Sequence, residues 1–133
     1  MTIQVSIINE GSSPSETINN LPIKEFIVNN YASKSDFLAN AANIESGVII
    51  INTSTPFQGN ISDYVRIRNL SRVPILVLSN IIKPGIVEKV LDSGADEYLL
   101  KPVSLPLLKS RLRALARRSH HPVDYLSNVP RQT

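Results

Sequence analysis

Lys101 is the residue of this chain best placed to take part in chemistry, because it follows a short apolar run typical of a buried strand. Gly94 can adopt the positive φ that ends a helix, and residues 98–100 then suit a strand that Pro102 stops. Lys101 therefore stands at the carboxyl end of a strand, where open parallel sheets bind their ligands. Its ammonium group would face whatever the neighbouring strands present at the same edge.

Polar residues follow the other strand-like segments in the same way, and a phenol lies within the last one. The residues concerned are Asn9, Glu10, Asn52, Ser79 and Tyr98. Two simpler interpretations stay open: Asn9 and Glu10 can form a polar turn, and Ser79 can bond the next backbone amide. An asparagine amide is a poor nucleophile and adds no negative charge to a metal site, so Asn52 limits the chemistry of this edge.

The spacing of apolar residues predicts five strands that alternate with five helices. The strands are expected at 3–8, 25–28, 47–51, 73–78 and 98–100, and the helices at 12–20, 35–42, 61–70, 85–92 and 104–118. Unbroken apolar runs such as 47–51 are typical of parallel strands that are buried on both faces. This order predicts an α/β fold with a doubly wound, five-stranded parallel sheet.

The helices carry further signals of how they begin and pack. Ser35 and Ser104 are expected to cap the second and fifth helices, and Arg66 and Arg68 to point outward from the third. Apolar stripes at helical spacing are expected to be buried. They comprise Ile61, Tyr64, Val65, Ile67 and Leu70 in the third helix, Ile86, Val87, Val90 and Leu91 in the fourth, and Leu107, Leu108, Leu112 and Leu115 in the fifth.

Composition and charge limit the class of protein. The 133 residues fit one domain, and an apolar content of 42% suffices for a core. No apolar run of membrane-spanning length and no leader-like start are present, so a cytoplasmic location is expected. The absence of cysteine excludes disulfides and zinc–thiolate sites. His120 and His121 lack a third ligand for a metal and suit the end of a helix.

Two segments resemble the receiver domain of response regulators, in its winged-helix (OmpR/PhoB-type) transcription-factor branch. They are Gly94-Ala95-Asp96-Glu97-Tyr98-Leu99-Leu100-Lys101-Pro102 and Arg111-Leu112-Arg113-Ala114-Leu115-Ala116-Arg117-Arg118. The resemblance extends by pattern and register over residues 3–118 and implies a flavodoxin/CheY-like fold. In that family the first strand ends in two acidic residues that hold magnesium, and the third in a phosphoacceptor aspartate. Ser79, Tyr98 and Lys101 match the remaining positions of the family's pocket.

The chain departs from this family at two positions that carry negative charge. Asn9 replaces one of the magnesium-holding acids, with Glu10 kept, and Asn52 stands at the phosphoacceptor position. The resemblance therefore implies an atypical receiver, or pseudo-receiver. Such a domain would be no enzyme, would accept no aspartyl phosphoryl group and would bind magnesium weakly or not at all. A displaced acceptor at Thr53 or Ser54 would need an adjacent base, and none is evident.

Lys101 would lose two of the three negative partners that the family's pocket supplies. A buried ammonium group without compensation is unfavourable. Lys101 is therefore expected to bond to the neutral oxygen of Asn52, or to Glu10. We also expect it to hold the pocket in one fixed arrangement with Ser79 and Tyr98.

The resemblance also implies symmetric dimers through the face of the fourth helix, the fifth strand and the fifth helix. Charged residues are available there for pairing. They are Lys89, Asp92, Asp96, Glu97, Arg111 and Arg117. A monomer with solvated charges stays the alternative.

The predicted function is that of a regulatory signalling module without conventional aspartyl phosphorylation. Residues 1–118 would form the receiver-like domain, and residues 119–133 a linker or disordered tail. An effector domain, expected to be transcriptional, and a sensor kinase are the implied partners, and no membrane contact is expected. The alternative is a nucleic-acid contact through the last helix, because residues 101–118 hold six of the fourteen basic residues and no acid. Aromatic or glycine-rich recognition elements are missing, so direct nucleic-acid binding is not expected.

Overall fold

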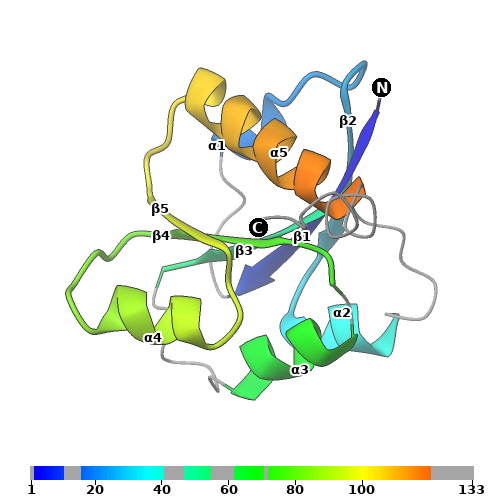
Figure 1. Cartoon of the computed structure of the whole chain (residues 1–133). Helices are drawn as coiled ribbons and strands as arrows, with labels where there is room; N and C mark the ends of the chain where they lie inside the picture. The colour runs from blue at the N-terminus through cyan, green and yellow to red at the C-terminus, as the bar shows by residue number, and fades with distance from the viewer. Residues whose placement is uncertain (1, 11–15, 41–46, 55–61, 71, 121–133) are drawn as a thin grey trace, which may run out of the picture.

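A computed structural model describes residues 2–10, 16–40, 47–54, 62–70 and 72–120 of the chain. Five parallel strands form one sheet in the order β2-β1-β3-β4-β5 (Figure 1). Their bounds are β1 (Ile3–Glu10), β2 (Phe26–Tyr31), β3 (Val48–Thr53), β4 (Ile75–Ser79) and β5 (Glu97–Leu100). The predicted doubly wound parallel sheet is confirmed.

Helices cover both faces of this sheet. Those in the described residues are α1 (Glu16–Asn19), α2 (Lys34–Ala39), α3 (Ser62–Leu70), α4 (Ile86–Asp92) and α5 (Leu105–His120). In Figure 1, α1 and α5 lie on one face, and α2, α3 and α4 lie on the other. The sheet is therefore the middle of three layers. Because its strands are parallel, all their carboxyl ends lie at one edge of the sheet.

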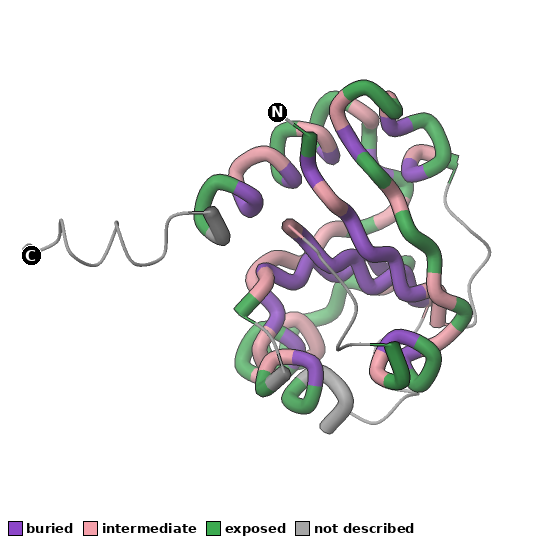
Figure 2. Tube along the Cα trace, turned by 90° about the vertical axis from the view of Figure 1, so that its right-hand side faces the viewer, coloured by how far each residue is buried: buried purple, intermediate pink, exposed green. Residues whose placement is uncertain are grey.

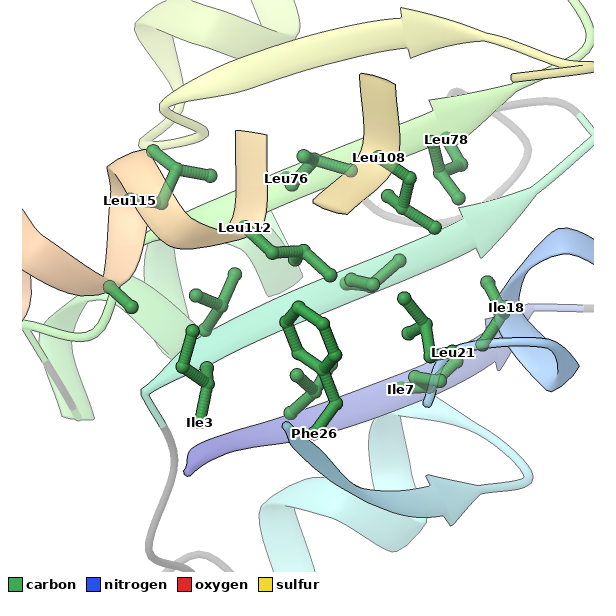
Figure 3. Close-up of a cluster of buried hydrophobic side chains, with 14 of the residues drawn as sticks. Ile3, Ile7, Ile18, Leu21, Phe26, Leu76, Leu78, Leu108, Leu112 and Leu115 are labelled. Atoms are coloured by element: carbon green, nitrogen blue, oxygen red, sulfur yellow. The ribbon is translucent and has the colours of Figure 1, made fainter. Parts of the chain in front are cut away.

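The apolar runs supply two cores, because successive side chains of a strand point to opposite faces. In β3, Ile50 belongs to the core beneath α1 and α5, whereas Ile49 and Ile51 belong to the core beside α2, α3 and α4. Figure 3 shows the first core, in which Leu108 and Leu112 of α5 join side chains of the strands. Every residue of β3 is buried, as the purple central trace in Figure 2 illustrates. The central strand is therefore shielded from water up to its carboxyl end.

Serine caps begin two helices, one of them at a different residue than predicted. The N-cap of α2 is Ser33 and not Ser35, because Ser33 Oγ accepts the backbone N–H of Asp36 at 3.0 Å. Ser104 Oγ accepts the backbone N–H of Leu107 at 3.3 Å, so the predicted cap of α5 is confirmed. The shift in α2 places Lys34, rather than a later residue, at the first position of that helix.

The buried stripes of three helices are narrower than their apolar spacing predicted. Val65, Leu91 and Leu107 are 42%, 38% and 40% exposed. Each of these helices meets the sheet along a single line, which is already filled by residues such as Val90 in α4 and Leu108 in α5. Apolar residues beside that line therefore stay in contact with solvent.

Arg68 was predicted to point outward, and this is wrong. Its Nε and Nη2 donate to the carbonyl of Gly94 at 3.1 and 2.8 Å, and its Nη1 donates to the carbonyl of Val73 at 3.0 Å. Nη2 also bonds to Asp96 Oδ2 at 2.5 Å. Gly94 has a φ of +124°, and a Cβ there would lie 3.0 Å from Cβ of Arg68. Glycine is thus needed for both the backbone and the space, and Arg68 ties α3 to the turn before β5.

Several predictions fall on residues 11–15, 41–46, 55–61, 71 and 121–133, which lie outside the described residues. They include the predicted start of the first helix and the proposed tail, as well as the side chains of Tyr64 and Leu70. The last helix, α5, continues to His120, two residues beyond the predicted end of the domain. In the described part of the chain, no helix is both long and apolar enough to cross a membrane.

Candidate functional site

The carboxyl ends of the strands bring the predicted polar residues to one edge of the sheet. The pairing of β1 with β3 sets Asn9 beside Asn52 and Glu10 beside Thr53. Lys101 directly follows β5, and its backbone N–H donates to the carbonyl of Ser79 at 2.8 Å. The register of a parallel sheet thus assembles this edge from four strands.

A chain of side-chain hydrogen bonds runs along this edge. Lys101 Nζ donates to Asn52 Oδ1 at 2.6 Å, and Asn52 Nδ2 donates to Asn9 Oδ1 at 3.0 Å. Asn9 Nδ2 then donates to Asn30 Oδ1 at 3.3 Å. Asn52 is fully buried at the centre of the chain. We call Lys101, Asn52, Asn9 and Asn30 the amide chain; it connects the end of β5 to β2 without a carboxylate.

Lys101 bonds to the neutral oxygen of Asn52, as predicted. Partial burial lowers the pKa of Lys101, because removing the ammonium group from water disfavours its charged form. The Lys101–Pro102 peptide bond is cis. The other predicted partner of this lysine, Glu10, is engaged elsewhere.

Glu10 forms an ion pair with Lys34, the first residue of α2. The two side chains are only 13% and 9% exposed. Sequence reasoning missed Lys34 because it lies 24 positions from Glu10 and outside every strand end. One signal was available: Lys34 follows a serine in a cap position, and a cation is disfavoured at a helix N-terminus. An unfavourable charge at that point indicates a partner elsewhere in the fold.

Ser79 and Tyr98 both contact the backbone of Ile81. Ser79 Oγ accepts the Ile81 N–H at 3.0 Å, and the Tyr98 hydroxyl donates to the Ile81 carbonyl. The bond of Ser79 is the simpler interpretation that the sequence left open. Ser79 is fully buried and Tyr98 is half-buried, so both side chains fix the loop after β4 next to the amide chain.

The residues of this edge do not fit a magnesium ion. Magnesium needs several oxygen ligands in octahedral geometry and usually at least one free carboxylate. Glu10 Oε2 faces Lys34, and the side-chain oxygens of Asn9 and Asn52 already accept hydrogen bonds. Glu10 Oε1 is buried without a hydrogen-bond partner. Among the described residues, no three His, Cys, Asp or Glu side chains gather to hold a metal.

On the predicted dimer face, Asp96, Glu97 and Arg111 form ion pairs within the chain. Glu97 pairs with Arg111 at 2.9 Å, and Asp96 pairs with Arg68 and, at 3.6 Å, with Arg118. Lys89, Asp92 and Arg117 of the same face are exposed to solvent. Exposed apolar residues accompany them on each element of the face. They are Leu91 of α4, Leu100 of β5 and Leu107 of α5.

Curated proteins similar to this chain include transcriptional regulators. The KDP operon transcriptional regulatory protein KdpE of Escherichia coli is 37% identical over 82 residues, which are 61% of this chain and 36% of KdpE. The transcriptional regulatory protein PrrA of Mycobacterium leprae is 31% identical over 101 residues, which are 74% of this chain and 42% of PrrA. The chain thus spans well under half the length of these two relatives. No protein-family model matches it.

Solved structures with the same fold include response regulators. A two-component response regulator from Clostridium difficile superposes with a TM-score of 0.71 and 21% identity, covering 88% of this chain and 98% of that one. A response regulator from Thermotoga maritima gives a TM-score of 0.76 and 20% identity, covering 88% and 99% of the two chains. These similarities support the flavodoxin/CheY-like α/β fold.

Proposed function

We propose that this chain, which has the receiver fold and sequence relatives among transcriptional response regulators, is a response-regulator receiver domain whose state is set without aspartyl phosphorylation. It would act in two-component signalling on an effector domain that controls transcription. It would itself be no enzyme.

The amide chain is the observation that carries this proposal. A phosphoacceptor needs a nucleophilic oxygen at the end of β3, and that position holds an amide whose nitrogen and oxygen are both hydrogen-bonded. Lys101 binds this amide in place of a carboxylate. These hydrogen bonds would hold the pocket in one arrangement without a carboxylate in the amide chain.

A displaced acceptor at Thr53 or Ser54 gains no support. Thr53 lies beside Glu10 in the sheet, and Glu10 is the only carboxylate at the described strand carboxyl ends. A hydroxyl nucleophile needs a base within hydrogen-bond reach. The ion pair with Lys34 engages Oε2 of Glu10, the candidate base.

The output surface proposed here is the dimer face defined above, with a second copy of the chain as partner. Exposed charge pairs contribute little, so an apolar centre is needed. Leu91, Leu100 and Leu107 supply it, and the exposed ends of Lys89, Asp92 and Arg117 supply a charged rim.

Sedimentation velocity with and without acetyl phosphate tests both parts of the proposal. The dimer should weaken at least about tenfold on Leu107→Glu, since a charge would enter the apolar centre. The control Ile23→Glu changes another apolar residue, 88% exposed and outside this face, and should leave the dimer intact. Acetyl phosphate should change the dimer affinity of neither variant. A dimer that strengthens with acetyl phosphate would contradict the phosphorylation-independent state, and equal losses in both variants would contradict the assigned face.

Nucleic-acid binding by α5 is not favoured, because three of its basic side chains, Arg111, Arg113 and Arg118, pair with carboxylates of the chain. Arg113 Nη2 bonds to Glu25 Oε1 at 2.7 Å, and Arg111 and Arg118 pair with Glu97 and Asp96. These pairs neutralise much of the charge that a phosphate backbone would need.

A further inference from the structure

Lys34 occupies a position that its own helix does not explain. Ser33 caps α2 by accepting the Asp36 N–H at 3.0 Å, which fixes Lys34 as the first helical residue. A cation at the N-terminus of a helix is opposed by the helix dipole. Lys34 is nevertheless 8% exposed, and lysine is seldom so buried unless it is paired. The reason for its burial must lie outside α2.

The partner that explains this burial is Glu10 at the end of β1. Both side chains are nearly removed from water, so each charge depends on the other. The ion pair joins α2 to the sheet edge at the residue that follows Asn9 of the amide chain. The positive charge nearest the carboxylate therefore comes from the chain itself.

We propose that Lys34 is the built-in cation of this pocket: its ammonium group takes the place at Glu10 that a divalent metal ion would need. This inference rests on the proposed function, because it explains how the pocket keeps one state without metal or phosphoryl group. An ammonium group on a side chain cannot exchange with the solution, unlike a metal ion. The contact between α2 and β1 is then independent of metal concentration.

The ammonium group of Lys34 would oppose metal binding in a second way, by charge repulsion. A divalent ion at Glu10 would lie next to a buried ammonium group, and like charges repel strongly where water is excluded. A carboxylate restored at position 52 would thus remain a poor metal site as long as Lys34 keeps its charge. Removing only this charge should open the site.

The test is a titration of magnesium chloride at constant ionic strength on four proteins, with the thermal midpoint and calorimetry as readouts. The proteins are the unchanged chain, Asn52→Asp, Lys34→Gln and the double variant. Glutamine keeps a hydrogen-bond donor for Glu10 but removes the charge. A metal that binds only the folded state raises the midpoint of thermal unfolding. The shift of this midpoint therefore reports metal binding even for a variant that is only partly folded. Lys24→Gln, which changes an exposed lysine, is the control in the Asn52→Asp background.

The double variant should bind magnesium at least about tenfold more tightly than Asn52→Asp alone, because the repelling charge is gone. Lys24→Gln should have no such effect. Equal affinities of the double variant and Asn52→Asp would overturn the role of Lys34 and leave the proposed function intact. Tight binding by the unchanged chain would instead count against the proposed function itself. The two failures are therefore distinguishable.

Discussion

Lys101→Met removes the ammonium group from the amide chain while keeping a side chain of similar length. The substitution loses one hydrogen bond with a charged donor, which contributes about 1.5–3 kcal/mol, and leaves Asn52 Oδ1 without this donor. It also removes the unfavourable desolvation of the ammonium group, which is the cause of the lowered pKa of Lys101. These effects oppose each other, so the free energy of unfolding should fall by only about 1 kcal/mol.

The same burial predicts how this difference depends on pH. Because its pKa is lowered, Lys101 in the folded protein releases its proton at a lower pH than in the unfolded chain, where its pKa has the ordinary value of 10.5. The unfolded state then binds more protons, and stability rises with pH in this window. The unchanged protein should therefore gain stability relative to Lys101→Met as the pH rises from neutral toward 10.5.

Urea denaturation at pH 7 and at alkaline pH measures both effects, with Lys24→Met as a control at an exposed lysine. A loss of several kcal/mol on Lys101→Met would refute the reasoning, since it would mean that Lys101 neutralises a buried negative charge. A large change in dimer affinity on the same substitution would refute the fixed arrangement of the pocket.

Two further predictions concern ion pairs of contrasting burial. Lys34→Met should lower the free energy of unfolding by about 3–5 kcal/mol, because it leaves the carboxylate of Glu10 buried without a counter-ion. Urea denaturation measures this loss, and a loss as small as that of Lys101→Met would contradict the prediction. The hydrogen bonds from Arg113 lower the pKa of Glu25 below its ordinary 4.5, so the stabilisation by this carboxylate should be present above pH 4.5 and lost as the pH falls through the lowered pKa. Glu25→Gln should accordingly be less stable than the unchanged protein at pH 7 and equal to it at strongly acidic pH, as urea midpoints would show.

The sequence predicted the sheet and its functional edge because both depend on local signals. The run 47–51 indicates a buried strand by composition alone, and the strand indeed lies at the centre of the sheet. Gly94 indicated a helix end through its backbone freedom, and Lys101 followed from the strand after it. Once the strands are parallel, their carboxyl ends must meet, so the contact between Lys101 and Asn52 could be predicted.

The missed features depend on how elements pack, which spacing along the chain does not encode. Arg68 looked like a solvent-exposed charge of its helix, but it reaches Gly94, 26 positions away, once α3 lies on the sheet. Lys34 likewise reaches Glu10 only because α2 lies beside β1. Asn30 joins the amide chain only because β2 is the neighbour of β1. The width of a buried helical stripe likewise depends on the sheet beneath it, so the exposure of Leu91 and Leu107 was not visible in the sequence.

Intact-mass spectrometry after incubation with acetyl phosphate and magnesium tests the central claim most directly. The unchanged protein should show no added phosphoryl group, because the amide of Asn52 offers no nucleophilic oxygen. Phosphoserine in a reference protein of known occupancy would confirm that the instrument detects the mass gain. A stable gain of one phosphoryl group that maps to Thr53, Ser54 or another residue of this edge would contradict the account.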